Sequence, residues 1–480
     1  MQYSIVDKSR LQDNLRIDAE FYSPDFLSLT EKLNSKKADL LRDYIYFAKK
    51  GIFDLSPDLY VTHGIPLIRT SEIKDPLIDF SSTAFLEENT HETNKKTELN
   101  PGDIVFTKIG AYIGDIAVLP PKYKKYNFSQ NVIGAKVRKD KIKSGFLLAF
   151  LLSKYGNKQI KRVIMLSGQG KLELEDIKNI KIVVFDEKTK SLIHNLVTEA
   201  EGLKENSVDL YKEAEQILLS ELGLANWKPK RQLSFVKNFS DTESADRIDA
   251  EYFQPMYDDL IEKVAQYGNG YQKLGDLVSI KKCIEPGSEA YQENGVPFLR
   301  VSNLSKFGVN NDNQQYISEL LYEELKNYQP EQGEILLSKD ATPGIAFYLN
   351  NEPEKMIPSG GILRMKVKDV KAIYPEYLTL ALNSVVVQKQ IERDIGGSVI
   401  NHWLVDQVKK TLIPILPESI QKDISDKIAD SFLKREQSKK LLDIAKRGVE
   451  MAIEQNEEEA TRWLNEEVNH ASSSIHLESR

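Results

Sequence analysis

The chain repeats itself once, over nearly its whole length. Arg16-Ile17-Asp18-Ala19-Glu20-Phe21-Tyr22 returns 231 residues later as Arg247-Ile248-Asp249-Ala250-Glu251-Tyr252-Phe253. At the same offset, Gly64-Ile65-Pro66-Leu67-Ile68-Arg69 returns as Gly295-Val296-Pro297-Phe298-Leu299-Arg300. Chance does not produce a series of matches in order at one offset. The chain therefore consists of two homologous halves, about 1–231 and 232–480.

A repeat of this length excludes a solenoid, whose units are far shorter. The chain has 480 residues, enough for two large domains or about three ordinary ones. Each half is therefore a domain with an additional segment, and two related halves suit a target that is itself roughly twofold.

Hydrophobic patterns predict the same mixed α+β domain, of about 185 residues, in each half. The opening Arg-Ile-Asp-Ala-Glu segment predicts a short helix with a local ion pair between its Arg and Glu. Expected strands follow at 65–73, 102–106, 132–137 and 180–185, with counterparts at 296–304, 333–337, 362–367 and 411–416. Short helices are expected at 146–152 and 377–382.

Each domain is followed by a long amphipathic pattern. In the first half, apolar or small residues alternate three and four apart from Ile193 to Ile217, which is a heptad seam. The second seam, from Ile420 to Ala452, is interrupted by Ser431, Arg435 and Ser438. Each helix could pack only on its own domain, but two at equivalent places favour mutual pairing. A helix of about 35 residues spans about 50 Å.

These patterns divide the chain into six segments. They are a first domain at 1–188, a helix at 189–224, a loop-like linker at 225–245, a second domain at 246–417, a helix at 418–456, and an acidic, disordered tail at 457–480.

The net charge of −7 argues at face value against a nucleic-acid partner, but it is unevenly distributed. Residues 1–231 carry 36 basic and 32 acidic side chains, and residues 101–190 carry 18 and 8. A locally basic surface can bind phosphate on an acidic protein, so the charge permits a polyanionic partner without establishing one.

Several classes of function lack their motifs. A single cysteine, Cys283, excludes an internal disulfide and any multi-cysteine metal site, and the six histidines lack the spacing of a helical zinc motif. Phosphate-loop, dinucleotide and nucleophile-elbow motifs are missing, so we expect no catalytic residue, cofactor or metal in this chain. No apolar run approaches the ~18 residues that span a bilayer, and the N-terminus lacks the apolar core of a signal peptide, so we expect a cytoplasmic protein.

Polar loops of the first domain could read a polyanion. Lysines and tyrosines interleave at 122–126, a pattern that suits phosphate contact with base or sugar packing, although a solvated lysine loop explains it equally well. Gln and Asn side chains can pair with adenine. The candidate DNA-binding residues here are Arg69, Ser71, Lys108, Tyr112, Lys122, Tyr123, Lys124, Gln130, Asn131, Gln169 and Lys171.

The second domain offers matched positions with different chemistry. Arg69 and Arg300 end matched strands, where each could read guanine or form a local ion pair. Lys108 and Lys339 precede matched loops, where phosphate contact and a solvated lysine are the alternatives. The candidates in this half are Arg300, Ser302, Asn303, Lys339, Thr342, Ser359, Asn401 and His402.

This arrangement resembles the DNA specificity subunit of type I restriction–modification systems. The similarity covers the chain to about residue 455 and is carried by the duplication, the two Gly-x-Pro-x-x-Arg strands, and the segments Gly102–Gly110 and Gly333–Lys339. The resemblance implies two target recognition domains, each reading half of a bipartite site on double-stranded DNA, and two long helices that pair antiparallel and set the spacer. It also implies two docked methyltransferase subunits, which carry S-adenosylmethionine, and a restriction subunit that can join them.

Two alternatives remain. A two-domain coiled-coil adaptor would bind protein rather than DNA, which the overall acidity favours. A self-contained methyltransferase or nuclease with divergent motifs would bind S-adenosylmethionine or a divalent metal by itself.

Overall fold

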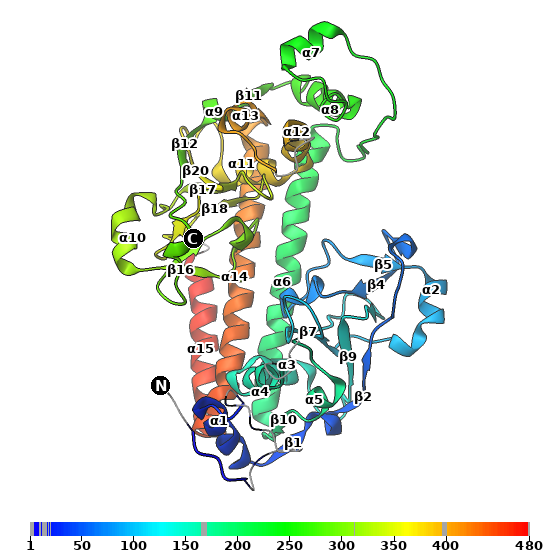
Figure 1. Ribbon diagram of the computed structural model, residues 1–480, viewed down its shortest axis with the longest axis vertical. Coiled ribbons are helices and arrows are strands. Elements are labelled where there is room, and N and C mark those ends of the chain that lie inside the picture. Colours follow the sequence, from blue (N-terminus) through cyan, green and yellow to red (C-terminus); the bar gives the residue numbers. More distant parts are fainter. Residues whose placement is uncertain are drawn as a thin grey trace. The chain divides into compact units, whose positions relative to one another are not determined.

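The computed structural model describes residues 4–8, 11, 17, 19, 21–164, 170–311, 313–395 and 401–478. The chain forms two compact units (Figure 1). Unit 1 comprises Met1–Asn206 and Lys434–Arg480, and unit 2 comprises Ser207–Leu433. Unit 2 is therefore one continuous segment, whereas unit 1 contains both ends of the chain.

Unit 1 contains short strands and helices followed by the first part of a long helix. In chain order its elements are α1 (Pro24–Asn34), β1 (Ala38–Leu40), β2 (Ile45–Lys50), β3 (Tyr60–Val61), β4 (Ile65–Ile68), β5 (Ala84–Leu86), α2 (Glu88–Thr93), β6 (Ile104–Thr107), β7 (Ile116–Val118), β8 (Asn127–Phe128), β9 (Val132–Val137), α3 (Ser144–Leu152), α4 (Lys154–Ile164), α5 (Leu174–Lys178), β10 (Lys181–Val183) and α6 (Glu187–Glu221).

Unit 2 has the same succession. Its elements are α7 (Phe239–Ala245), α8 (Pro255–Ala265), β11 (Tyr271–Lys273), α9 (Leu274–Leu277), β12 (Val278–Lys282), β13 (Val296–Leu299), β14 (Leu304–Ser305), β15 (Gly308–Val309), β16 (Gln315–Ile317), α10 (Glu319–Leu325), β17 (Glu334–Ser338), β18 (Ala346–Tyr348), β19 (Ile357–Pro358), β20 (Ile362–Val367), α11 (Pro375–Asn383), α12 (Val385–Ile395), α13 (Val405–Lys410), β21 (Leu412–Pro414) and α14 (Glu418–Glu454). The last helix, α15 (Glu457–Glu478), belongs to unit 1.

The sheets of the two units correspond, apart from β3 in unit 1 and the β14-β15 pair in unit 2, which confirms two tandem α+β domains. The order β2-β9-β6-β7 in unit 1 matches β12-β20-β17-β18 in unit 2, and β5-β4-β8 matches β16-β13-β19. In the two sheets that contain the Gly-x-Pro strands, the last pair is parallel, β4 with β8 and β13 with β19. The repeat in the sequence therefore encodes one sheet topology twice.

Most predicted strands and helices are confirmed, but the Gly-x-Pro strands are shorter than expected. The pattern predicts strands to residues 73 and 304, whereas β4 ends at Ile68 and β13 at Leu299. The chain then turns because Glu72 and Asn303 accept hydrogen bonds from the backbone N–H groups of Arg69 and Arg300. Such local side-chain bonds compete with a strand's own hydrogen bonds.

The helices α6 and α14 pack together in an antiparallel pair, as predicted. In unit 2, Ser207 of α6 faces Ser431 of α14, and further along α6 Glu213 binds Lys427 at 2.9 Å. In unit 1, Ala200 faces Ser438. Partner numbers fall within unit 2 as α6 numbers rise, so the helices run in opposite directions.

Serines explain the interruptions of the second seam. The Oγ atoms of Ser431 and Ser438 donate to the backbone oxygens of Ser207 and Ala200, both at 2.7 Å. All four residues are buried. Small hydroxyl side chains allow two helix backbones to approach and remain hydrogen-bonded when dry. Two of the three interruptions in the apolar pattern are therefore contacts of the helix pair, and the third, Arg435, lies 3.6 Å from Asp79.

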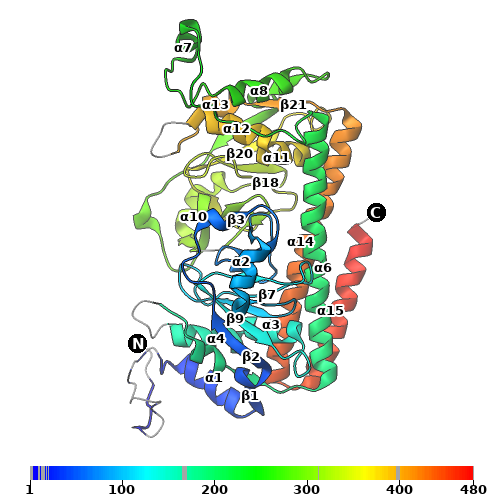
Figure 2. The same cartoon turned by 90° about the vertical axis from the view of Figure 1, so that its right-hand side faces the viewer.

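The C-terminal segment is helical, which corrects the expectation of a disordered tail. Helix α15 lies along α14 (Figures 1 and 2). Ala460 and Leu464 are fully buried, and Leu464 packs so closely on Gly448 that a Cβ there would meet its Cδ2 at 2.6 Å. The acidic composition predicts disorder because it outweighs this short apolar face in the sequence. Burial of the apolar face offsets the conformational entropy that is lost when the helix becomes ordered.

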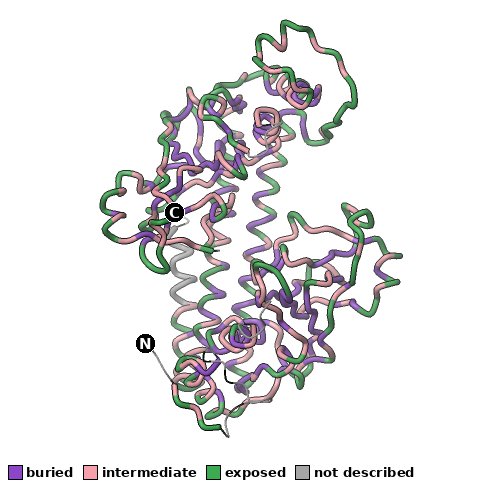
Figure 3. The backbone as a smooth tube through the Cα atoms, viewed as in Figure 1, coloured by how far each residue is buried: buried purple, intermediate pink, exposed green. Residues whose placement is uncertain are grey.

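The segment that opens each half also differs from expectation. Residues 247–249 form no regular element and 250–253 form turns, and Arg247 pairs with Asp249 at 2.7 Å, whereas Glu251 pairs with Arg231. Arg16, Asp18 and Glu20 of the first copy lie outside the described residues. The linker contains the short helix α7, on an excursion coloured as exposed in Figure 3.

Within the described ranges, none of the helices combines the length and the apolar character needed to cross a membrane.

Candidate nucleic-acid interface

Four segments of unit 1 meet where its strands end, and we call this surface tip 1. It comprises 69–71 after β4, 108–112 after β6, 129–131 between β8 and β9, and 170–171 before α5. Backbone hydrogen bonds join the segments: Ser129 N–H to Ile68 O at 2.9 Å, Lys108 N–H to Asn131 O at 2.8 Å, and Leu172 N–H to Lys108 O at 3.0 Å. Tip 1 is therefore a connected surface on a rigid sheet.

Unit 2 builds the same surface from its own copies, which we call tip 2. It comprises 300–302, 339–342, 359–361 and 401–402. The joining bonds recur: Ser359 N–H to Leu299 O, Lys339 N–H to Gly361 O and Trp403 N–H to Lys339 O, each at 2.8 Å. The backbone of the two tips is thus equivalent, and their differences lie in the side chains.

Tip 1 carries a cluster of lysines. Lys108 is 8% exposed, and its Nζ donates to Gln130 O at 2.8 Å, a neutral partner. Burial lowers the pKa of Lys108, and the nearby charges of Lys50 and Lys171 lower it further. Glu173 binds both Lys171 and Lys50, the latter at 3.4 Å. Two lysines therefore share one carboxylate and Lys108 binds a neutral oxygen, which leaves a positive surface suited to phosphate.

Tip 2 replaces this cluster with a nearly neutral one. Lys339 Nζ lies 2.5 Å from Asp340 Oδ2, and His402 Nδ1 lies 2.8 Å from Asp340 Oδ1. Lys339 corresponds to Lys108, and His402 corresponds to Lys171. Tip 2 therefore offers hydrogen-bond acceptors as well as donors, where tip 1 offers mainly positive charge.

The two matched arginines have different partners. Arg69 forms two bonds with the buried Glu72, Nη2 to Oε1 at 2.8 Å and Nε to Oε2 at 3.2 Å, and this hydrogen bonding raises the pKa of Arg69. Asn303 takes the place of Glu72 in tip 2. Arg300 Nη2 donates to Asn313 O at 2.5 Å, as Arg69 Nη2 donates to the matched Ser82 O at 3.0 Å. Arg300 Nε is buried without a hydrogen-bond partner within the described part of the chain. The ion-pair alternative thus holds for Arg69 in this structure, whereas none of the carboxylates among the described residues takes that role at Arg300.

The lysine–tyrosine stretch at 122–126 is mostly structural in this conformation. The Tyr123 ring packs against Phe80, Phe85 and Tyr126, with ring centroids 5.2, 5.9 and 6.0 Å apart. Lys122 binds Glu205 of α6 at 2.9 Å, whereas Lys124 is exposed. The packed Tyr123 ring is not presented for stacking on a base.

The remaining candidates divide by exposure. Tyr112 is half-buried under Lys74, whose Nζ lies 4.3 Å from the ring centroid. Gln130 is tied back, since its Oε1 accepts from the N–H of Asp54 at 3.3 Å. Asn303 and Ser359 are buried. Ser302, Thr342, Asn131 and Ser71 are exposed, Asn401 is half-buried, and Gln169 lies outside the described residues.

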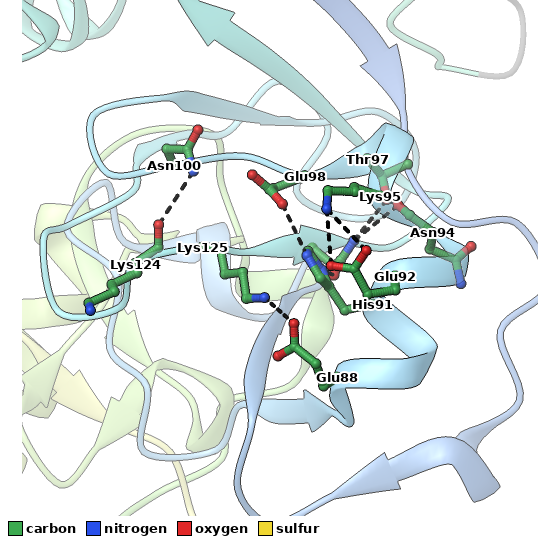
Figure 4. A network of polar contacts seen from close by, with 11 residues as sticks. Glu88, His91, Glu92, Asn94, Lys95, Thr97, Glu98, Asn100, Lys124 and Lys125 are labelled. Atoms are coloured by element: carbon green, nitrogen blue, oxygen red, sulfur yellow. Dashed lines mark hydrogen bonds and ion pairs between the residues drawn. The ribbon is translucent and has the colours of Figure 1, made fainter.

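A second polar cluster in unit 1 invites a metal-site interpretation but does not support it (Figure 4). The side chains of Glu88, His91 and Glu92 lie close enough to share an ion. However, His91 is fully buried, and its nitrogens face Asn127 Oδ1 and Glu98 Oε2. Glu88 and Glu92 bind Lys125 and Lys95. These contacts stabilise the loop before β6 and occupy both ring nitrogens of His91.

The sequence reasoning missed Lys50, Glu173 and Asp340. Asp340 follows Lys339 directly in the sequence, so adjacency to a candidate lysine was an available signal. Lys50 and Glu173 are distant in sequence, and only the sheet brings them to tip 1.

The chain matches the family described as type I restriction modification DNA specificity domain twice, over residues 41–186 and 269–443. These two ranges cover both sheets and both tips.

Solved structures that are similar to this chain include an S subunit of a type I restriction–modification system from M. genitalium. It is 13% identical, covers 87% of this chain and 94% of its own, and has a TM-score of 0.38. The HsdS subunit from Thermoanaerobacter tengcongensis is 15% identical, with coverage of 88% and 97% and a TM-score of 0.29. A third, from work on type I R-M complex assembly and conformational transition, is 14% identical, with coverage of 88% and 98% and a TM-score of 0.29. Comparison with curated proteins gives no match.

Proposed function

Because the chain belongs to the family of type I restriction–modification DNA specificity domains and carries two of them, we propose that each unit reads one half of a bipartite DNA site. The chain is then a DNA sequence-recognition subunit of a type I restriction–modification complex. The proposal concerns how the two units divide this task and which residues perform it.

One observation supports the division most directly. Tips 1 and 2 share a backbone hydrogen-bond pattern but differ in the side chains they present. A fixed scaffold with variable tips suits two modules that read different sequences, because base edges are distinguished by their hydrogen-bonding patterns.

The chemistry of each tip suggests roles for its residues. Lys108, Lys171 and Lys50 form the positive part of tip 1 and suit phosphate contacts, which position a protein on DNA. Asn131, exposed on the same tip, suits contact with an adenine edge. In tip 2, Arg300 suits guanine or phosphate, and Ser302, Thr342 and His402 suit groove contacts.

The long helices suit a second role. We propose that α6 and α14 fix the spacer between half-sites and dock two methyltransferase subunits, with which restriction subunits can associate. S-adenosylmethionine and catalysis would then belong to the partners, which would work with this chain in the cytoplasm. A heptad added to or deleted from both helices should change the spacer length and leave the half-site bases unchanged.

The test is co-expression with the modification subunits in a host without adenine methylation, followed by methylome sequencing. A methylated bipartite motif with a fixed gap is expected only when all the subunits are present. Binding of the purified complex to a motif duplex should weaken steeply with salt, by a logarithmic slope of about 0.9 per phosphate contact.

Two results would contradict the proposal. Methylation by this chain alone would make it an enzyme, and salt-insensitive or absent DNA binding by the whole complex would favour the protein-binding adaptor.

A further inference from the structure

One position in each tip is presented to a ligand by matched anchors. Ile109 follows Lys108 and Asp340 follows Lys339, and both stand at the start of the loop after the central strand. The preceding residue is fixed on both sides, through its N–H to the β8–β9 or β19–β20 turn and through its carbonyl to the segment before α5 or α13. The backbone just before residues 109 and 340 is therefore held in place, so the positions of these two residues are well defined.

The surroundings of Asp340 restrict it further. Ala341 N–H donates to Asn401 O at 3.0 Å, and Ala341 adopts a φ of 58°, a left-handed conformation that costs energy for a residue with a Cβ. Lys339 and His402 each bind one carboxylate oxygen of Asp340. A carboxylate has about four acceptor sites, so two remain after these bonds are made.

Ile109 differs sharply from its neighbours in burial. Residues 103–108 are buried, whereas Ile109 is 36% exposed and belongs to the large apolar side chains that face solvent. An apolar side chain among three lysines does not serve phosphate binding. It does suit the one apolar group in the DNA major groove, the thymine C5 methyl.

We propose that residues 109 and 340 form an equivalent specificity-determining position, at which Ile109 selects thymine in one half-site and Asp340 selects cytosine in the other. This inference rests on the proposed function and adds to it the position and the bases.

The acceptor pattern of the major groove explains the choice of cytosine. Guanine presents the acceptors N7 and O6, and thymine presents O4, so both oppose a carboxylate. Adenine presents its N6 amino group beside the acceptor N7. The major-groove edge of cytosine itself carries only the N4 donor and no acceptor, so it is the base from which Asp340 accepts best.

The experiment uses the complex with its modification subunits, the motif found by methylome sequencing, and competition binding by duplexes changed at one base pair at a time. Asp340→Asn should reduce discrimination for cytosine at one position of one half-site by about tenfold, a typical cost of one mismatch. Glu352→Gln, at an exposed carboxylate elsewhere in unit 2, should leave every preference unchanged.

For Ile109 the probe is a duplex with uracil in place of thymine, which removes only the methyl group. Wild-type binding should weaken a few-fold at one thymine of the other half-site, and Ile109→Ala should be insensitive to the same replacement. Leu59→Ala, at a side chain that is 46% exposed, is the control and should behave as wild type. Ile109→Val, a smaller change, should give an intermediate sensitivity.

The inference is overturned if Asp340→Asn keeps all base preferences or if uracil weakens wild type and Ile109→Ala equally. These results leave the proposed function intact, because the wild-type motif is still read. If the wild-type complex yields no bipartite motif and no salt-sensitive binding, the proposed function fails and this inference fails with it.

Discussion

The two units hold the helix pair by different forces at equivalent places. In unit 1, Asp75 binds Lys204 of α6, and Asp79 lies 3.6 Å from Arg435 of α14. In unit 2 the residue matched to Asp75 is Lys306, which lies over the Tyr211 ring of α6 at 4.4 Å. Phe307 packs edge-on against Tyr211, with centroids 5.0 Å apart. One unit uses buried charge where the other uses aromatic packing.

This difference teaches that the repeat maintains the loop that contacts the helices, at residues 75 and 306, but neither the chemistry of the contact nor its position on the helices. Lys204 and Arg435 are themselves repeat equivalents, and both belong to unit 1. Burial lowers the pKa of Lys204 and of Arg435, against the raising effect of the Asp75 charge. Burial raises the pKa of Asp79, but hydrogen bonds from Ser81 and the charges of Arg435 and Lys204 outweigh it, so this pKa is lowered. In this group, which we call the ionic anchor, the two carboxylates of Asp75 and Asp79 compensate the two buried cations of Lys204 and Arg435. Removal of any one of them therefore leaves an uncompensated charge.

Removing one charge from this anchor should have the largest effect. Asp79→Asn leaves two buried cations with one carboxylate, so unit 1 should lose about 4 kcal/mol of unfolding free energy. Hydrogen exchange during urea unfolding resolves the two units, and unit 2 should change little. Asp423→Asn, on an exposed part of α14, is the control. An unchanged unit 1 would show that the ionic anchor is not needed.

Exchanging the partners of the matched arginines should have the next largest effect. Glu72→Gln removes a buried carboxylate from Arg69 and should destabilise unit 1 by about 3 kcal/mol. Asn303→Asp places a carboxylate beside Arg300 and should be neutral or stabilising. Urea unfolding of each variant measures both, and equal losses in the two would contradict the asymmetry.

Glu201 in α6 and Phe432 in α14 occupy the same position in the repeat. Glu201 should make the stability of the protein depend on pH. Burial, with repulsion from Glu205, raises the pKa of Glu201 to about 7. The folded state therefore keeps a proton that the unfolded state releases above its ordinary pKa, and stability is lost as pH rises towards and through 7. Glu201→Gln should remove this loss and gain about 2 kcal/mol at pH 8 but nothing at pH 4. Unfolding midpoints across this pH range measure it, and a pH-independent difference would contradict the assignment.

The smallest effect concerns DNA. Lys108→Met should weaken duplex binding by about tenfold and lower the salt slope by about one, while protein stability is maintained because a buried cation with a neutral partner is removed. Lys339→Met should change the salt slope less, since Asp340 already compensates that charge. Titrations of the complex from low to high salt compare them, and equal slopes would mean that both tips contact phosphate alike.

The sequence predicted well where local pattern and burial agree. The strands at 132–137 and 362–367 are confirmed to the residue, because an apolar run between turn residues has few alternatives. The heptad seam of α6 is confirmed as well, with Ile193, Ala200 and Ala214 fully buried.

What could not be predicted depends on contacts between distant residues. Nothing near Tyr123 in the sequence shows that Phe80 and Phe85 pack against its ring. The choice between ion pair and base reader at Arg69 depended on Glu72, whose burial is a tertiary property. The roles of the candidate site residues in DNA binding stay predictions.

Unit 2 is inserted into unit 1 through the helix pair, and this has a consequence for exchange between genes. The segment 207–433 begins and ends where Ser207 and Ser431 touch, with their Oγ atoms 3.2 Å apart. Insertions whose two ends are adjacent are the ones that folded proteins tolerate best. Two recombination events, one in the coding sequence of α6 and one in that of α14, would replace this whole segment at once. A new half-specificity could then be acquired in one event, with the other half untouched.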